Sequence, residues 1–240
     1  MTENWSVDAA RVRDNLLRIE EEIQNACVAA GRRREEVTLM AVTKTVAPDL
    51  INVALDNGIR CIGENRVQEY LGKRDALHLE GVTRCLIGHL QTNKVRHIVG
   101  EVDRIESVDS VHLAQAISDT SLKRIGKPTD VLVEINIGNE DSKSGIAAET
   151  LEEFLDEISS LQGIRVRGLM AIPPILHKES EKRAIFSQMH KLFIDIGGKI
   201  VDNISMDILS MGMSSDYVEA VLEGSTQVRV GSAIFGERHS

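Results

Sequence analysis

The chain has 240 residues, of which 42% are hydrophobic and 27% charged, proportions typical of a globular protein with a large buried core. Its formal net charge of −9 argues against binding to nucleic acid or to an anionic membrane surface, and no apolar stretch is long enough to span a bilayer. Three cysteines without a CxxC pair, in a chain without a signal peptide, predict reduced thiols and a cytoplasmic protein.

The N-terminal segment is expected to be helical. Its apolar residues recur at steps of three or four, the spacing of one helix face. They are Val12, Leu16, Ile19, Ile23, Cys27 and Ala30. Ser6 and Asp8 suit the start of this helix, and Gly31 suits its C-cap. We expect the helix to cover the bottom or the side of the fold.

After this helix the chain alternates between strand-like and helix-compatible segments. Strands are expected at 37–43, 59–62, 83–88, 103–107, 130–137, 165–170, 206–210 and 227–230. Helices are expected at 48–57, 65–78, 91–98, 110–124, 149–160, 178–196 and 215–223. This alternation predicts a parallel sheet, and at this length a closed (β/α)8 barrel of the TIM type. Because no linker divides the chain, we expect a single domain over residues 1–240.

Lys44 follows the first expected strand. Alternate residues of a strand share a face, so Lys44 is expected on the same side as Val42 and Met40. Active sites of such barrels form at the C-terminal ends of the strands. Burial there would lower the pKa of the amine and favour the neutral form, which can attack a carbonyl group to make a Schiff base. A lysine whose ammonium reaches solvent from a strand edge would give the same pattern.

Two turns containing glycine and serine follow the seventh and eighth expected strands. The first contains Gly212, Ser214 and Ser215, and the second contains Gly231 and Ser232. Barrels often bind phosphate between these two loops, because free backbone N–H groups converge there. Each turn alone also suits an ordinary helix N-cap. Together with a lysine on the first strand, the two turns predict a phosphorylated aldehyde as ligand, and pyridoxal 5′-phosphate (PLP) fits that description.

Arg229 lies in the last expected strand. If Val228 and Val230 face the helices, Arg229 points into the barrel. There it would face the pyridine nitrogen of PLP and keep that nitrogen unprotonated, which weakens the ring as an electron sink. A core arginine paired with Glu134 or Glu64 would explain the same pattern equally well.

Seven stretches in chain order form a specific signature. They are AVTKT (41–45), IGENRVQEY (62–70), IGHLQTNKVR (87–96), VEINIGNEDSKSGI (133–146), RGLMAIPP (167–174), LSMGMSSDYVEAV (209–221) and GSTQVRVGSAIFGER (224–238). In these stretches the chain resembles the pyridoxal phosphate homeostasis protein family. The resemblance implies a fold-type III PLP barrel, similar to the N-terminal domain of alanine racemase.

The resemblance also implies roles for individual residues. Lys44 would be the Schiff-base lysine, and Arg229 would face the ring nitrogen. The other residues implied are Asn65, His89, Met211, Met213, Ser214, Gly231 and Ser232. The phosphate would be held by Ser214, Gly231 and Ser232, with help from the backbone of Met213. Asn65 and Met211 would line the pocket near the ring, and His89 would lie at its mouth.

The function implied by the resemblance is intracellular PLP homeostasis, in which a monomer holds PLP on Lys44 and passes it to apo-enzymes without robust turnover of its own. Alternatives are a PLP-dependent amino-acid racemase or decarboxylase, and a class I aldolase acting on a sugar phosphate. A two-base racemase needs a second acid or base opposite the lysine. Tyr70 and Tyr217 are the two tyrosines, and both lie on expected helices. Class I aldolases usually carry their lysine on a late strand, and the late strands here have none.

Overall fold

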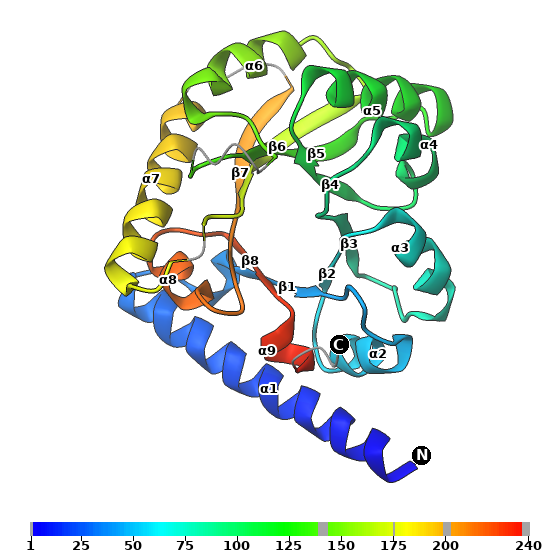
Figure 1. Cartoon of the computed structure of the whole chain (residues 1–240), viewed down its shortest axis with the longest axis vertical. Helices are drawn as coiled ribbons and strands as arrows, with labels where there is room; N and C mark the ends of the chain where they lie inside the picture. Colours follow the sequence, from blue (N-terminus) through cyan, green and yellow to red (C-terminus); the bar gives the residue numbers. More distant parts are fainter. Residues whose placement is uncertain (1, 139–143, 175, 199–202, 237–240) are drawn as a thin grey trace.

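A closed barrel of parallel strands forms the centre of the computed structural model, which describes residues 2–138, 144–174, 176–198 and 203–236 (Figure 1). The strands are β1 (Thr38–Val42), β2 (Cys61–Glu64), β3 (Thr83–Leu86), β4 (Arg104–Val108), β5 (Thr129–Ile135), β6 (Ile164–Ala171), β7 (Ile204–Met213) and β8 (Gln227–Val230). Each strand pairs in parallel with the next, and β8 closes the barrel by pairing with β1. The expected (β/α)8 fold is therefore confirmed.

Helices surround this barrel, as Figure 1 shows. They are α1 (Thr2–Ala29), α2 (Pro48–Asp56), α3 (Val67–Lys73), α4 (Val95–Ile98), α5 (Val111–Arg124), α6 (Leu151–Ile158), α7 (Glu179–Gly197), α8 (Tyr217–Leu222) and α9 (Ser232–Phe235). Short 3-10 turns are η1 (Arg34–Glu36), η2 (Arg74–Ala76), η3 (Thr92–Lys94) and η4 (Ala148–Thr150). In the part of the chain that the structure describes, no helix combines the length and apolar character needed to cross a bilayer.

Helix α1 packs along the side of the barrel, against α2, α8 and α9 (Figure 1). Its apolar face, which includes Val12, Ile19 and Ile23, is completely buried in the cluster that it shares with these helices. The helix begins at Thr2, before the expected start near Ser6, and ends just before Gly31 as expected. The N-terminal helix therefore covers the side of the barrel, which was one of its two expected places.

The bounds of β2 differ from the expected ones, since the strand runs from Cys61 to Glu64 instead of 59–62. Gly63 and Glu64 are buried and continue the ladder, since Gly63 pairs with Val42 and Glu64 with Leu86. A glycine and a glutamate have low intrinsic strand preference, so pattern alone ended the strand too early. Pairing with both neighbouring strands overrides that preference.

The barrel interior has an apolar part and a polar part. The apolar part is a small cluster formed by Met40, Val42, Cys61, Cys85 and Ile87. The polar part is a hydrogen-bonded network of Arg104, Glu106, Ser210, Gln227 and Arg229. The two larger apolar clusters lie between the strands and the helices. The alternation of side chains along the strands thus separates a mostly polar interior from an apolar outer shell.

Candidate functional site

Lys44 lies in a tight turn at the C-terminal end of β1 and is half-buried. The residue before it, Thr43, continues the sheet by donating its N–H to the carbonyl of Gly63 at 3.0 Å. The residue after it, Thr45, has a left-handed backbone with φ of 62°, and the N–H of Val46 returns to the carbonyl of Thr43 at 3.1 Å. Lys44 is thus held at the expected end of the barrel, with less burial than the sequence suggested.

The loops after β7 and β8 meet at Ser214. Its Oγ accepts hydrogen bonds from the backbone N–H groups of Gly231 at 3.1 Å and of Ala233 at 3.3 Å. A Cβ atom placed on Gly231 would lie 3.4 Å from the Cβ of Val42 in β1. The structure therefore brings the two expected phosphate loops together, and brings the second of them against the strand that leads to Lys44. Ser232 is exposed in the same loop.

The loop after β7 owes its shape to Gly212 and Asp216. Gly212 has φ of 91°, and an added Cβ would lie 2.5 Å from the Cβ of Ala220, so only glycine fits there without displacement. Asp216 Oδ1 accepts the N–H of Met213 at 2.6 Å. Burial raises the pKa of the Asp216 carboxyl. The backbone N–H of Met213, expected to help with phosphate, already has a partner in this loop.

Arg229 points into the barrel, as alternation predicted. Its guanidinium donates to the carbonyl and the hydroxyl of Ser210, both at 2.7 Å, and to the carbonyl of Ala171 at 2.8 Å. Burial lowers its pKa, and the charges of Glu106 and Glu134 act in the opposite direction. Its hydrogen bonds therefore run mainly to neutral oxygen atoms. Of the two carboxylates considered as its ion-pair partner, Glu64 is bound by Lys73 instead.

The side chain of Met211 packs on the outer side of β7. Its side chain is completely buried in the larger cluster between barrel and helices, together with Phe186 and Met189. The preceding residue, Ser210, faces the interior, where its hydroxyl donates to Glu106 at 2.8 Å. Met211, the next residue of β7, packs in the outer cluster, on the other side of the strand from Ser210. Its expected place near the PLP ring stays a prediction.

Asn65 and His89 follow β2 and β3 at the same end of the barrel as Lys44. Asn65 Oδ1 is inaccessible to solvent and has no hydrogen-bond partner among the described residues. His89 is exposed, and its Nδ1 lies 3.3 Å from Oδ2 of Asp109. A buried acceptor without a partner is costly unless a ligand or water satisfies it. Asn65 therefore marks a place where a hydrogen-bond donor of a ligand would be stabilised.

Glu134 on β5 is a site residue whose importance sequence reasoning missed. Its side chain is 8% exposed. Burial, aided by the negative charge of Asp109, raises its pKa to about 7, while Arg229 and His89 act in the opposite direction. The available signal was a single carboxylate within the apolar run VLVEI (131–135). Strand β5 lies across the barrel from β1 (Figure 1), so Glu134 belongs to the wall opposite Lys44.

The two tyrosines lie in the outer shell. Tyr70 is buried in the larger apolar cluster, and its hydroxyl donates to the carbonyl of Glu101 at 3.0 Å. Tyr217 is buried under α1, where its hydroxyl binds Glu22 and burial raises its pKa. Both tyrosines therefore pack between the strands and the surrounding helices.

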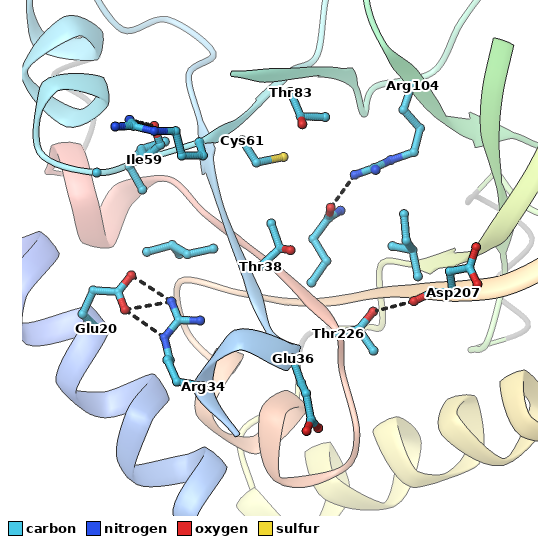
Figure 2. A pocket seen from close by; sticks show the side chains of 15 residues that line it. Glu20, Arg34, Glu36, Thr38, Ile59, Cys61, Thr83, Arg104, Asp207 and Thr226 are labelled. Carbon is cyan, nitrogen blue, oxygen red and sulfur yellow. Dashed lines mark hydrogen bonds and ion pairs between the residues drawn. The ribbon is translucent and has the colours of Figure 1, made fainter. Parts of the chain in front are cut away.

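A pocket of about 460 Å³ opens at the opposite end of the barrel, where the strands begin (Figure 2). Thr38, Cys61 and Thr83 line it from the first residues of three strands. Several of its charged groups form ion pairs, such as Arg34 with Glu20 at 2.8 Å (Figure 2), whereas Arg60 donates to the carbonyls of Leu55 and Ile59. This pocket is thus separate from the site around Lys44.

Comparison with known proteins identifies the family. Residues 7–239 match the family model described as alanine racemase, N-terminal domain. The pyridoxal phosphate homeostasis protein of Aquifex aeolicus is 39% identical over 225 residues, which are 94% of this chain and 97% of that protein. This chain belongs to the pyridoxal phosphate homeostasis protein family.

Two solved structures resemble this member of the pyridoxal phosphate homeostasis protein family over nearly its whole length. An unknown protein from Bifidobacterium adolescentis has a TM-score of 0.89 and 37% identity, with 95% of this chain and 96% of that chain covered. PipY of Synechococcus elongatus, with PLP bound, has a TM-score of 0.80 and 32% identity, with 94% and 100% covered. The barrel strands and the loops after β1, β7 and β8 lie within residues 7–239, the range that matches the family model.

Proposed function

We propose that this chain binds PLP as a Schiff base on Lys44 and acts in intracellular PLP homeostasis, as a cytoplasmic monomer that passes the cofactor to apo-enzymes. The names of its relatives and the PLP bound to PipY support this proposal. The observation that supports it most directly is the close approach of Gly231 to Val42 in β1, together with the hydrogen bond from the Gly231 N–H to Ser214 Oγ, because Lys44 and both loops follow strand ends at the same rim.

The residues of this rim fit PLP. When bound, PLP supplies an aldehyde, a phosphate and an electron-withdrawing ring. Lys44 supplies the primary amine, and the hydroxyls of Ser214 and Ser232 can donate to an anion, beside the N–H groups of Gly231 and Ala233 that Ser214 Oγ binds in this structure. Asn65 contributes an acceptor that no other described residue satisfies. This chain would therefore hold one end of the cofactor covalently and the other by hydrogen bonds.

Arg229 argues for a carrier with little turnover. A guanidinium donates hydrogen bonds but accepts no proton, so an arginine beside the ring nitrogen leaves that nitrogen unprotonated. The burial of Arg229 inside the barrel and its three hydrogen bonds fix its orientation. Together with the outer positions of Tyr70 and Tyr217, this arrangement favours storage and delivery over racemisation.

One observation favours the alternative, a PLP-dependent amino-acid racemase of fold type III. Glu134 is a carboxyl with a pKa of about 7 on the wall opposite Lys44, and such a pKa suits a general acid or base near neutral pH. A racemase would interconvert the enantiomers of alanine or serine at an enzymatic rate, and Glu134→Gln would abolish that rate. A chiral assay of the PLP-loaded protein that detects no conversion would rule out the racemase alternative.

The deciding experiment maps the attachment site. Full-length protein is incubated with PLP, reduced with borohydride, digested and analysed by mass spectrometry. We expect the reduced adduct on the peptide containing Lys44, its loss in Lys44→Ala, and its retention in Lys123→Met, which removes an exposed lysine on α5. An adduct that persists in Lys44→Ala would contradict the assignment.

The transfer of PLP to apo-enzymes needs a separate experiment. Loaded protein, freed of unbound PLP, is mixed with an apo-enzyme that requires PLP, and recovered activity is followed with and without a PLP-trapping enzyme in solution. Recovery that survives the trap supports transfer by contact. Recovery that the trap abolishes would mean that PLP is only released into solution.

A further inference from the structure

A buried ionic cluster lies directly beneath the turn that carries Lys44. It consists of Lys73 on α3, Glu64 at the end of β2, Glu69 on α3, and Thr43. The side chains of Lys73 and Glu64 are 8% and 1% exposed and form an ion pair. Lys73 Nζ also donates to the carbonyl of Thr43 at 2.7 Å and to Oε1 of Glu69 at 3.2 Å. An ammonium has three donors, so these three acceptors match the donor capacity of Lys73.

The cluster contacts the chain on both sides of Lys44. Before it, Thr43 gives its carbonyl to Lys73, and its hydroxyl donates to Oε1 of Glu64 at 2.8 Å. After it, the backbone N–H of Thr45 donates to Glu69. Thr45 adopts φ of 62°, a conformation that costs a β-branched residue energy. The bond from its N–H to Glu69 helps to stabilise this strained conformation.

The charges of the cluster depend on one another. Burial raises the pKa of Glu64, and the ammonium of Lys73 opposes that shift. A buried carboxylate that loses its partner becomes costly, and so does a buried ammonium. The cluster therefore acts as one unit, and its two helical members bind the turn to α3.

We propose that Lys73, acting through Glu64 and Glu69, is a positioning residue that fixes the backbone on both sides of Lys44 and thereby sets the place and reactivity of the Lys44 amine. This inference rests on the proposed function of Lys44 as the attachment site. It also assigns different roles to two lysines that lie close together: Lys44 reacts, while the donors of Lys73 are occupied and it stays unmodified.

Four variants separate the effect of the Lys73 charge from the effect of its side-chain shape. Lys73→Met keeps the length of the apolar stem but removes the charge, and Lys73→Arg keeps the charge. The double variant Glu64→Gln with Lys73→Met removes both buried charges, so that neither is left unpaired if the single variant fails to fold. Lys123→Met is the matched control, because it removes a lysine from the exposed end of α5. Circular dichroism and thermal unfolding establish that each variant is folded.

Two measurements report on the amine of Lys44. Ligand-free protein is labelled with an acetylating reagent, and the rate at each lysine is measured by mass spectrometry. PLP affinity is measured by spectral titration. In wild-type protein we expect fast labelling of Lys44 and slow labelling of Lys73. In the folded variants without the Lys73 charge we expect the Lys44 labelling rate to change. We also expect PLP affinity to fall by roughly tenfold or more, because a small displacement of a reacting group weakens the interactions that depend on its position. Lys73→Arg should recover most of the affinity, and Lys123→Met should match wild-type protein.

The outcomes separate this inference from the proposed function. The positioning role would be overturned if wild-type protein carries its adduct on Lys44 while the folded Lys73 variants keep the wild-type PLP affinity and Lys44 labelling rate. That result would leave the proposed function intact. Wild-type protein without any adduct on Lys44 would overturn the proposed function. In that case, a changed Lys44 labelling rate in the ligand-free Lys73 variants would still support the effect of Lys73 on the turn that carries Lys44.

Discussion

The Oγ atom of Ser214 lies 3.1 Å from the backbone nitrogen of Gly231 and accepts its hydrogen bond. This bond joins the loop after β7 to the loop after β8. The register between these strands shifts between Ser210 and Met213, just before Ser214. The hydroxyl of Ser214 therefore links the two loops of the proposed phosphate site directly.

Replacing Ser214 by alanine should weaken both the loop contact and PLP binding. The N–H groups of Gly231 and Ala233 lose their acceptor, which should lower the free energy of unfolding by about 1 kcal/mol. Loss of one donor to an anion should lower PLP affinity roughly tenfold, while excess PLP still modifies Lys44. Urea unfolding and spectral titration measure the two effects. Ser159→Ala, which removes an exposed hydroxyl after α6, should change neither, and equal affinity in both variants would contradict the role of Ser214.

Glu134 should make stability fall as pH rises from about 4.5 to about 7. Its pKa is about 7 in the folded protein, raised from 4.5 by burial and by Asp109 against the effects of Arg229 and His89. Below pH 4.5 both states are protonated, so the group has no effect there. Between about pH 4.5 and 7 the unfolded state has released the proton of Glu134 while the folded state still holds it, which favours unfolding. Above pH 7 this difference has lowered the free energy of unfolding by about 3 kcal/mol.

Glu134→Gln should remove this part of the pH dependence. The variant is expected to gain stability relative to wild-type protein as pH rises from 5 to 8, as measured by urea unfolding at a series of pH values. Glu149→Gln, at an exposed position, should follow the wild-type profile. Parallel profiles for Glu134→Gln and wild-type protein would show that the buried carboxyl ionises at an ordinary pH.

Glu106 should be essential for the polar network inside the barrel. It accepts from Arg104 Nη2 at 2.8 Å, from Ser210 Oγ at 2.8 Å and from Gln227 Nε2 at 2.9 Å. Burial tends to raise its pKa, but Arg104, Gln227 and Arg229 together hold the pKa below its ordinary value. The carboxylate therefore stabilises the fold above pH 4.5, and this stabilisation is lost as pH falls through the lowered pKa.

Glu106→Gln leaves the guanidinium of Arg104 without its counter-charge in the barrel. We expect a loss of about 3–5 kcal/mol in the free energy of unfolding at pH 7, measured with urea. The difference from wild-type protein should shrink in acid, where wild-type Glu106 becomes protonated. Glu153→Gln on the exposed face of α6 serves as control. A loss below 1 kcal/mol would mean that the network adapts to a neutral partner.

Gly88 should resist substitution because the backbone of Asn65 lies against it. A Cβ atom at this position would come within 2.2 Å of the carbonyl oxygen of Asn65. Gly88→Ala should therefore cost about 1–3 kcal/mol and should also reduce PLP affinity by displacing Asn65. Gly72→Ala on α3 meets no atom within 4 Å and should stabilise the helix by about 1 kcal/mol. Thermal unfolding of both variants compares the two sites, and similar melting temperatures would contradict the clash.

The fold and the outline of the site followed from local patterns. Strand and helix periods alternate along the chain, and strand alternation placed Arg229 inside the barrel, as its bonds to Ser210 confirm. The loops of Ser214 and Gly231 were expected together because neighbouring strands of a barrel end at the same rim. The same alternation, applied to β7, would have placed Met211 outside; the family resemblance had suggested otherwise.

The sequence by itself determined the barrel, the lysine at the end of β1 and the serine-glycine loops, because these depend on residues close together in the chain. Only the tertiary structure decided that Lys73 and Glu69 bind the residues around Lys44, that Glu134 lies buried near Asp109, and that α1 covers the side of the barrel. Pairing between distant segments and the burial of charge depend on how the chain closes in space. Periodicity along the sequence carries no record of either.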